Sequence, residues 1–247
     1  MADTKNIYKL PPVVEVFCEV RFQQSKYLPF DKLSTLHSKI KSSFSEVSET
    51  LRSEEQISYL RGTVKDSKLI KFFDKDRNYM FQVSDDLFSF HQFKPYKKWE
   101  DFKNILISNF KIYKDVIQPS NIKYLLITYK NLINLPRAEN LLLENYFNVF
   151  PSVPDNFPNM NEFSCKINLP YGNKEIAILD LKSIPVNLQT EYISFELNLN
   201  YFIAVPSNDI LSENNMLLKQ AQLRIEELFE GAITDNCKNL FGRNKNV

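Results

Sequence analysis

Residues 11–22, PPVVEVFCEVRF, alternate between apolar and polar positions in the manner of a β-strand with one buried face. Side chains of an extended chain point to opposite faces in turn. One face therefore carries only apolar residues: Val14, Val16, Cys18, Val20 and Phe22. The other face carries Val13, Glu15, Phe17, Glu19 and Arg21. The pattern predicts a strand whose apolar row lies in the core and whose prolines stand at its start.

Apolar residues recur every three or four positions in three segments, which predicts three long amphipathic helices. The first spans 31–51, the second spans about 97–117 and ends before Pro119, and the third spans about 208–232. Thr234 and Asp235 are expected to cap a final turn over Cys237 and Leu240, and Gly242 is a fitting stop for it.

Runs of strand-forming residues separated by turn residues predict eight further strands. Four short ones, at 57–64, 68–74, 78–84 and 87–93, are expected to form an antiparallel meander. The long run at 122–135 is apolar on both faces, which favours a strand buried from both sides. The remaining strands are expected at 163–170, 175–184 and 192–205, with a hairpin turn at 171–173 between the first two.

This order of elements predicts an α+β fold with mostly antiparallel sheets and three long amphipathic helices, arranged as two β/α halves packed together. The N-terminal half is expected at 1–135 and the C-terminal half at 163–247. Between them, 136–162 contains four prolines and is interpreted as a proline-rich connector with a short helix.

Composition narrows the function classes. The 247 residues include 31 basic and 30 acidic side chains, so the whole chain lacks the basic excess of a nucleic-acid-binding protein. Three widely spaced cysteines without a CxxC pair favour free thiols in a reducing compartment over a zinc site or a disulfide framework. The N-terminus has no apolar signal-peptide core, and no apolar run reaches bilayer length. A cytoplasmic location without membrane binding is therefore expected.

Glycine and histidine are scarce, which excludes several catalytic architectures. The four glycines are not clustered, so the usual P-loop, Rossmann and kinase glycine-rich loops are excluded. The GxSxG, HExxH and HxE…CxxC patterns are also missing from the sequence. The two histidines, His37 and His91, have no spacing that brings them together. No catalytic residue, cofactor or metal site is predicted.

Glu15, Glu19 and Arg21 are candidate partner-binding residues because they share one face of the first strand. Glu19 and Arg21 stand about 7 Å apart on an extended chain and could pair. Glu15 and Glu19 are about 13 Å apart, too far for the carboxylate pair of a glycosidase. Two interpretations stay open: a solvated strand face with cross-strand ion pairs, or a polar groove that receives a partner. Arg137, isolated in a loop, is a further candidate contact residue.

The predicted helix at 97–117 is the best candidate for nucleic-acid binding. Tyr96 and Tyr113 accompany the lysines on its outer side, which are Lys97, Lys98, Lys103, Lys111 and Lys114. Acidic residues at 100, 101 and 115 dilute this charge, so an ordinary solvated helix face is the alternative.

Asp180 and Glu196 come from neighbouring predicted strands and could form an acid–base pair. No third group of a catalytic constellation accompanies them. An unrecognised enzyme would use Glu15, Glu19, Arg21 or Asp180.

Three stretches occur in a characteristic order: PPVVEVFCEVRF, PYKKWEDFKNILISNFKIYKDVIQPSNIKYLLITYKNLINLP and ITDNCKNLF. Together they resemble a sporadically distributed bacterial protein family of unassigned function, over nearly the whole chain. The resemblance implies an association with mobile defence or toxin–antitoxin genes, and it carries over no catalytic residues. The family's middle motif has more glycine and proline around its helix, where this chain has Lys97 and Lys98.

The sequence thus predicts a non-enzymatic protein-interaction module, such as an accessory or antitoxin-like subunit of a bacterial defence or toxin–antitoxin complex. Its expected partner is a protein made by a neighbouring gene, bound through a sheet edge or an amphipathic helix. A homo-oligomer is compatible with the sequence. The alternatives are a nucleic-acid-binding protein and an enzyme with a carboxylate-based site.

Overall fold

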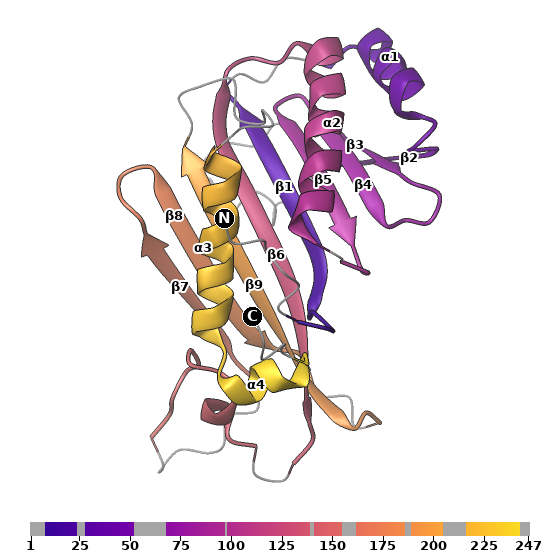
Figure 1. The fold of residues 1–247 in the computed structure, drawn as a ribbon. Helices are drawn as coiled ribbons and strands as arrows, with labels where there is room; N and C mark the ends of the chain where they lie inside the picture. The colour runs from indigo at the N-terminus through magenta and orange to yellow at the C-terminus, as the bar shows by residue number, and fades with distance from the viewer. Residues whose placement is uncertain are drawn as a thin grey trace.

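The computed structural model describes residues 8–23, 28–51, 68–96, 98–138, 141–154, 162–185, 189–204 and 216–242. Within these ranges, nine strands form one antiparallel sheet in the order β2-β3-β4-β5-β1-β6-β9-β8-β7 (Figure 1). The strands are β1 (Val13–Phe22), β2 (Glu46–Leu51), β3 (Lys68–Phe73), β4 (Tyr79–Ser84), β5 (Leu87–Phe93), β6 (Ile122–Pro136), β7 (Ser164–Pro170), β8 (Glu175–Ser183) and β9 (Tyr192–Ala204). The helices are α1 (Phe30–Ile40), α2 (Trp99–Ile117), α3 (Met216–Ala232), α4 (Asp235–Leu240) and the short 3₁₀ helix η2 (Leu143–Asn145).

The predicted α+β class and the antiparallel pairing are confirmed, but nothing supports two packed halves. The long strand β6 pairs with β1 on one side and with β9 on the other, from Tyr124 opposite Ala204 to Pro136 opposite Tyr192. The ladder therefore continues unbroken from the first predicted half into the last. The described residues form one sheet, on which the helices pack.

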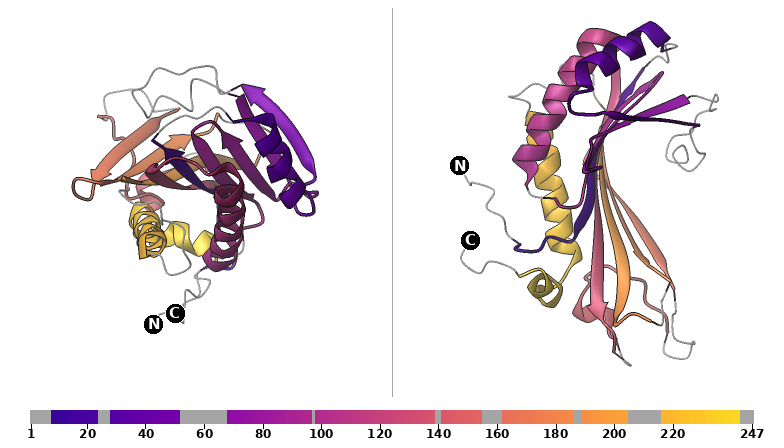
Figure 2. Two further views of the ribbon diagram at one scale, coloured as in Figure 1. Left: turned by 90° about the horizontal axis from the view of Figure 1, so that it is seen from above. Right: turned by 90° about the vertical axis from the view of Figure 1, so that its right-hand side faces the viewer.

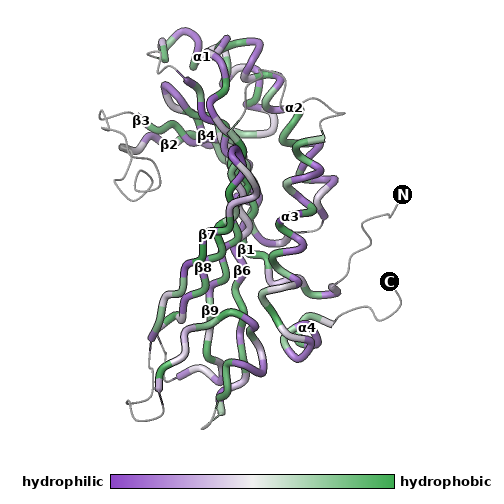
Figure 3. Tube along the Cα trace, turned by 90° about the vertical axis from the view of Figure 1, so that its left-hand side faces the viewer, coloured by the Kyte–Doolittle hydropathy of each residue, from purple (hydrophilic) through white to green (hydrophobic). Residues whose placement is uncertain are grey.

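The helices lie against one face of this sheet, and the sheet curves away from them (Figure 2). The apolar row predicted for the first strand points to that face, where Val16, Cys18 and Val20 are completely buried. The strand β7 shows the same alternation of hydrophobic and hydrophilic residues (Figure 3). The row from α2 that packs against the sheet is Trp99, Phe102, Leu106, Phe110, Tyr113 and Ile117. One apolar core thus fills the space between helices and sheet.

One helix prediction is wrong, and another lies partly outside the described residues. The segment 31–51 is not one helix: α1 ends at Ile40, and 46–51 is the edge strand β2, paired with β3. Serine and threonine are abundant after Ile40 and are weak helix formers, so pairing with β3 prevails over the apolar periodicity. Of the third predicted helix, 216–232 is helical in α3, and its first residues lie outside the described ranges, as does the predicted strand 57–64.

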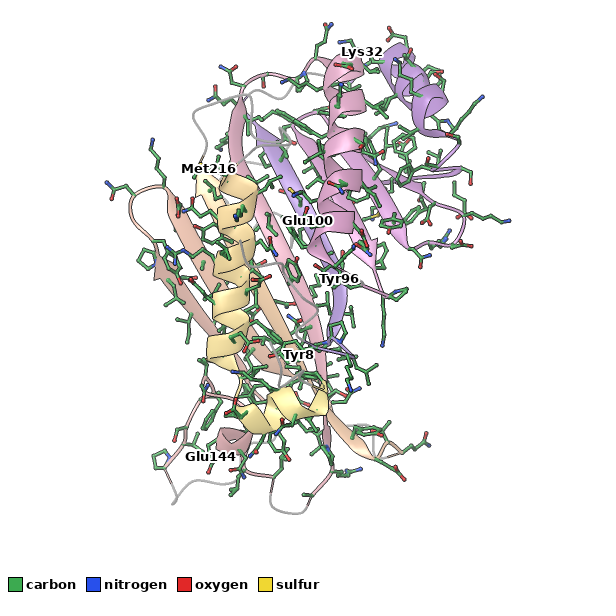
Figure 4. The ribbon with its side chains drawn as sticks, in the orientation of Figure 1. Tyr8, Lys32, Tyr96, Glu100, Glu144 and Met216 are labelled. Atoms are coloured by element: carbon green, nitrogen blue, oxygen red, sulfur yellow. The ribbon has the colours of Figure 1, made fainter. Side chains whose placement is uncertain are left out.

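The beginning and the end of the described chain pack together on the helical side. Tyr8, labelled in Figure 4, lies edge-on to Phe229 and Phe241 and donates a hydrogen bond to Glu230. The predicted cap is confirmed, because Thr234 Oγ1 accepts from Cys237 N at 3.4 Å at the start of α4. No helix in the described ranges has the length and apolar character needed to cross a membrane.

Candidate functional site

The face of the sheet opposite the helices forms a groove of about 590 Å³. Its lining comes from β1, β3, β4, β5, β6, β8 and β9, so it follows the curvature of the sheet seen in Figure 2. The polar row predicted for the first strand lies here, because Glu15, Glu19 and Arg21 all line the groove. So does Asp180.

The strand register arranges the residues of this sheet face in four cross-strand rows, the shortest of which is Leu87, Arg21 and Tyr124. The first row is Phe93, Glu15, Lys130, Asn198 and Asp180. The second row is Phe73, Met80, His91, Phe17, Thr128 and Asn200. The third row is Lys71, Gln82, Ser89, Glu19, Leu126 and Phe202. Directly opposite residues in adjacent strands have their Cβ atoms about 5 Å apart, so each row brings its side chains next to one another.

Glu15 is the centre of a hydrogen-bonded cluster. Its Oε1 lies 2.7 Å from His91 Nδ1, and its Oε2 lies 2.7 Å from Lys130 Nζ. The carboxylate side chain is only 14% exposed. Burial alone would raise the pKa of Glu15, but the hydrogen bonds and charges of His91 and Lys130 outweigh it and lower that pKa from 4.5 to about 2. Glu15 is therefore held as a carboxylate.

The cluster extends from Glu15 through His91 to Ser89, whose Oγ lies 2.9 Å from His91 Nε2. This order of carboxylate, imidazole and hydroxyl is also that of an activated serine nucleophile. Ser89, however, is completely buried, so no substrate reaches its hydroxyl. The Phe17 ring stacks on the His91 ring with centroids 4.7 Å apart and covers it further. The chain of hydrogen bonds therefore joins β1 to β5 and fixes the groove floor.

Arg21 forms the second charged cluster. Its Nε lies 2.5 Å from Glu19 Oε1, and its Nη1 lies 3.1 Å from Asp86 Oδ1. Burial alone would lower the pKa of Arg21, but Glu19 and the other anionic neighbours raise it. The predicted pairing of Glu19 with Arg21 is confirmed. Of the open interpretation of a solvated strand face with cross-strand ion pairs, the ion pairs are present, as between Glu15 and Lys130, but Arg21 is only 6% exposed.

The β8–β9 side of the groove carries two oxygens that accept no hydrogen bond from the described residues. They are Oδ1 of Asp180 and Oδ1 of Asn198, and both atoms are buried. Glu196 does not pair with Asp180: it accepts from Asn198 Nδ2 at 2.6 Å and lies 3.1 Å from Lys182 Nζ. The acid–base pair considered for Asp180 and Glu196 is therefore not formed.

The other candidate residues lie away from the groove. Arg137 is exposed after β6 and donates to the backbone oxygen of Thr190 at 3.4 Å. Directly before α2, Lys98 lies 3.6 Å from Asp101. Lys103 likewise lies 2.5 Å from Glu100, which Figure 4 labels.

Two of the other lysines proposed for nucleic-acid binding also lie away from the groove. Lys111 and Lys114 are exposed on α2, and Lys97 lies outside the described residues. The helix α2 covers the sheet face opposite the groove (Figure 2). The lysine set and the groove are thus separate surfaces, and each stays a prediction as a binding site.

Sequence reasoning assigned no role to Thr128, Lys130, Asn198 and Asn200, although all four line the groove. Thr128 Oγ1 donates to Asn200 Oδ1 at 2.8 Å and so joins β6 to β9. The available signal was the spacing: each strand carries two polar residues two positions apart within an apolar run. This period places them on one face, but not next to β1.

Among the described residues, no group of three or more His, Cys, Asp or Glu side chains is arranged to hold a metal ion. A scan against protein-family models finds no match to this chain, and a search of curated proteins finds none.

Proposed function

We propose that this chain is a non-enzymatic protein-interaction module that binds a segment of a partner protein in the groove. The observation that carries the proposal is the preorganised floor of this groove of about 590 Å³, on the sheet face that the helices leave open. Glu15 and Arg21 are already fixed by several hydrogen bonds each, so they need little reordering when a partner binds.

The charges of the groove favour a protein partner over nucleic acid. Three acids, Glu15, Glu19 and Asp180, line it together with three bases, which are Arg21, Lys71 and Lys130. Binding to a phosphate backbone relies on an excess of positive charge, and the groove has no such excess. A mixed polar surface flanked by phenylalanines is typical of a site for a polypeptide segment.

The enzyme alternative has weaker support. All four of its candidate residues, Glu15, Glu19, Arg21 and Asp180, line the groove. Glu15 is already hydrogen-bonded to His91, and Glu19 is paired with Arg21. The Ser89 hydroxyl, which lies next to His91, is buried. The resemblance to a family that accompanies mobile defence and toxin–antitoxin genes points to an adjacent gene product as the partner. In such a complex the chain would act as an accessory or antitoxin-like subunit.

Co-expression with the products of the adjacent genes tests the proposal. We expect a tagged chain to retain one of them through affinity and size-exclusion steps. Leu126→Arg places a long charged side chain on the groove floor and should abolish retention. Leu223→Arg makes the same change on α3, where Leu223 is 47% exposed, and should retain the partner. Circular dichroism verifies that both variants are folded. A wild-type chain that elutes alone, or a Leu126→Arg chain that keeps its partner, would overturn the proposal.

A further inference from the structure

A second pocket, of about 270 Å³, lies on the helical side of the sheet, where β1 ends, α1 begins and α2 ends. It shares no lining residue with the groove in the part of the chain that the structure describes. Its apolar walls are Phe22, Leu28, Pro29, Ile117 and Pro119. Its polar lining consists of Lys32, Asp85, Tyr113, Gln118 and Ser120. Apolar walls combined with a few polar groups are the usual form of a site for a small molecule.

Tyr113 is the deeply buried polar residue of this pocket. It is 1% exposed, and its ring stacks on Phe22 with centroids 5.8 Å apart. Burial raises the pKa of Tyr113, and the nearby carboxylates of Asp86 and Asp85 raise it further, so the hydroxyl stays neutral. Within the described ranges this hydroxyl makes no hydrogen bond, yet it is not among the fully enclosed oxygens such as Oδ1 of Asp180. A buried hydroxyl without a partner costs free energy, which a polar ligand in the pocket recovers.

Lys32 and Asp85 bring opposite charges to the pocket without pairing with each other. Lys32, labelled in Figure 4, donates one N–H of its ammonium to the backbone oxygen of Ile117 at 2.8 Å. The Oδ1 of Asp85 accepts a hydrogen bond from Leu28 N at 3.2 Å. Neither side chain has an ion-pair partner among the described residues. The ammonium has further N–H groups, and the carboxylate a second oxygen, with which to bind a ligand.

We propose that this pocket binds a free α-amino acid with an apolar side chain. The ligand's ammonium pairs with Asp85 and donates a second N–H to the Tyr113 hydroxyl, and its carboxylate pairs with Lys32. Its side chain contacts the apolar wall formed by Phe22 and Ile117. The end of a peptide carries only one of the two charges, so the pair of Lys32 and Asp85 selects a free amino acid. This inference goes beyond the proposed function, because the pocket and the groove are separate.

Three compounds with the same apolar side chain test the inference: L-leucine, isoamylamine, which lacks the carboxylate, and isocaproate, which lacks the ammonium. Each is titrated into the ¹⁵N-labelled chain, and backbone amide shifts are followed by NMR. We expect leucine to shift amides around Lys32, Asp85 and Ile117. The other two compounds should bind at least about tenfold more weakly, because each loses one charge-assisted hydrogen bond.

Two variants separate ligand binding from folding. Tyr113→Phe removes only a hydroxyl without a partner, so it should unfold at the same or a higher urea concentration, yet bind leucine about threefold more weakly. Asp85→Asn keeps the oxygen that accepts from Leu28 N but removes the charge, and should weaken leucine binding about tenfold. Asp76→Asn makes the same change in an exposed turn and should leave leucine binding unchanged.

Three results would overturn the inference. Equal shifts with all three compounds would mean that the pocket recognises only the apolar side chain. An absence of shifts at about 10 mM leucine would mean that the pocket holds only water. Unchanged leucine binding by Asp85→Asn or by Tyr113→Phe would remove the assigned contacts. Retention of the co-expressed partner is measured at the groove, so the proposed function can stand when the amino-acid site fails, and the reverse also holds.

Discussion

Glu15→Gln tests whether the groove floor is held together by the charge of one buried carboxylate. In the folded chain the pKa of Glu15 is about 2, against an ordinary 4.5. At about 1.36 kcal/mol for each pKa unit, this difference corresponds to about 3 kcal/mol of stability at pH 7. Because the folded pKa is the lower one, this stability is complete above pH 4.5 and is lost as pH falls toward 2. Roughly 2 kcal/mol of it is gone by pH 3.

Urea denaturation at pH 7 and at pH 3, followed by the fluorescence of the single tryptophan, measures this effect. Trp99 is buried at the start of α2 and reports unfolding of the core. We expect Glu15→Gln to lower the free energy of unfolding by about 3 kcal/mol at pH 7 and by only about 1 kcal/mol at pH 3. Glu49 forms an ion pair with Lys68, and its side chain is 55% exposed. Glu49→Gln therefore serves as the control and should change the free energy of unfolding little at either pH. A loss of equal size at both pH values would refute the reasoning.

Three further predictions concern the core, a helix cap and the thiols. Phe88→Ala should cost about 3–5 kcal/mol in urea denaturation, because its ring is completely buried against three aromatic rings. Phe30→Ala, at an 82% exposed position, should stay within about 0.5 kcal/mol of the wild type. Thr234→Ala should cost about 1 kcal/mol and lower the Tm, whereas serine at this position should preserve both; an unchanged alanine variant would contradict the capping role. In a thiol-reagent assay at pH 8, Cys18 should not react, because burial raises its pKa, whereas the half-buried Cys165 should react; a fast Cys18 would refute this.

Local periodicity was sufficient to predict much of the fold. The alternation in the first strand correctly placed Val16, Cys18 and Val20 in the core, because a two-residue period leaves only one way to bury an apolar row. Periodicity did not predict that α1 ends at Ile40. The apolar stripe of the helix continues through Phe44, but the chain beyond it pairs with β3. Local pattern decides which face is buried, and long-range pairing decides where an element ends.

The candidate site was harder to predict, because its contacts join distant parts of the sequence. Glu15 and His91 are 76 residues apart, and nothing local to either residue indicates their hydrogen bond. The low exposure of Arg21 comes with its position between Leu87 on β5 and Tyr124 on β6. A polar residue on the outer row of one strand becomes part of a groove only when the adjacent strands bend around it.

The strand that comes first in the sequence lies in the middle of the sheet, between β5 and β6. During synthesis, β1 therefore leaves the ribosome long before either neighbour is complete, and β6 must then wait for β9, which ends at residue 204. Pairings between such distant segments form slowly, since the entropy of closing long loops is lost before the contacts are gained. The nascent chain accordingly carries unpaired, aggregation-prone strand edges until β9 has been synthesised.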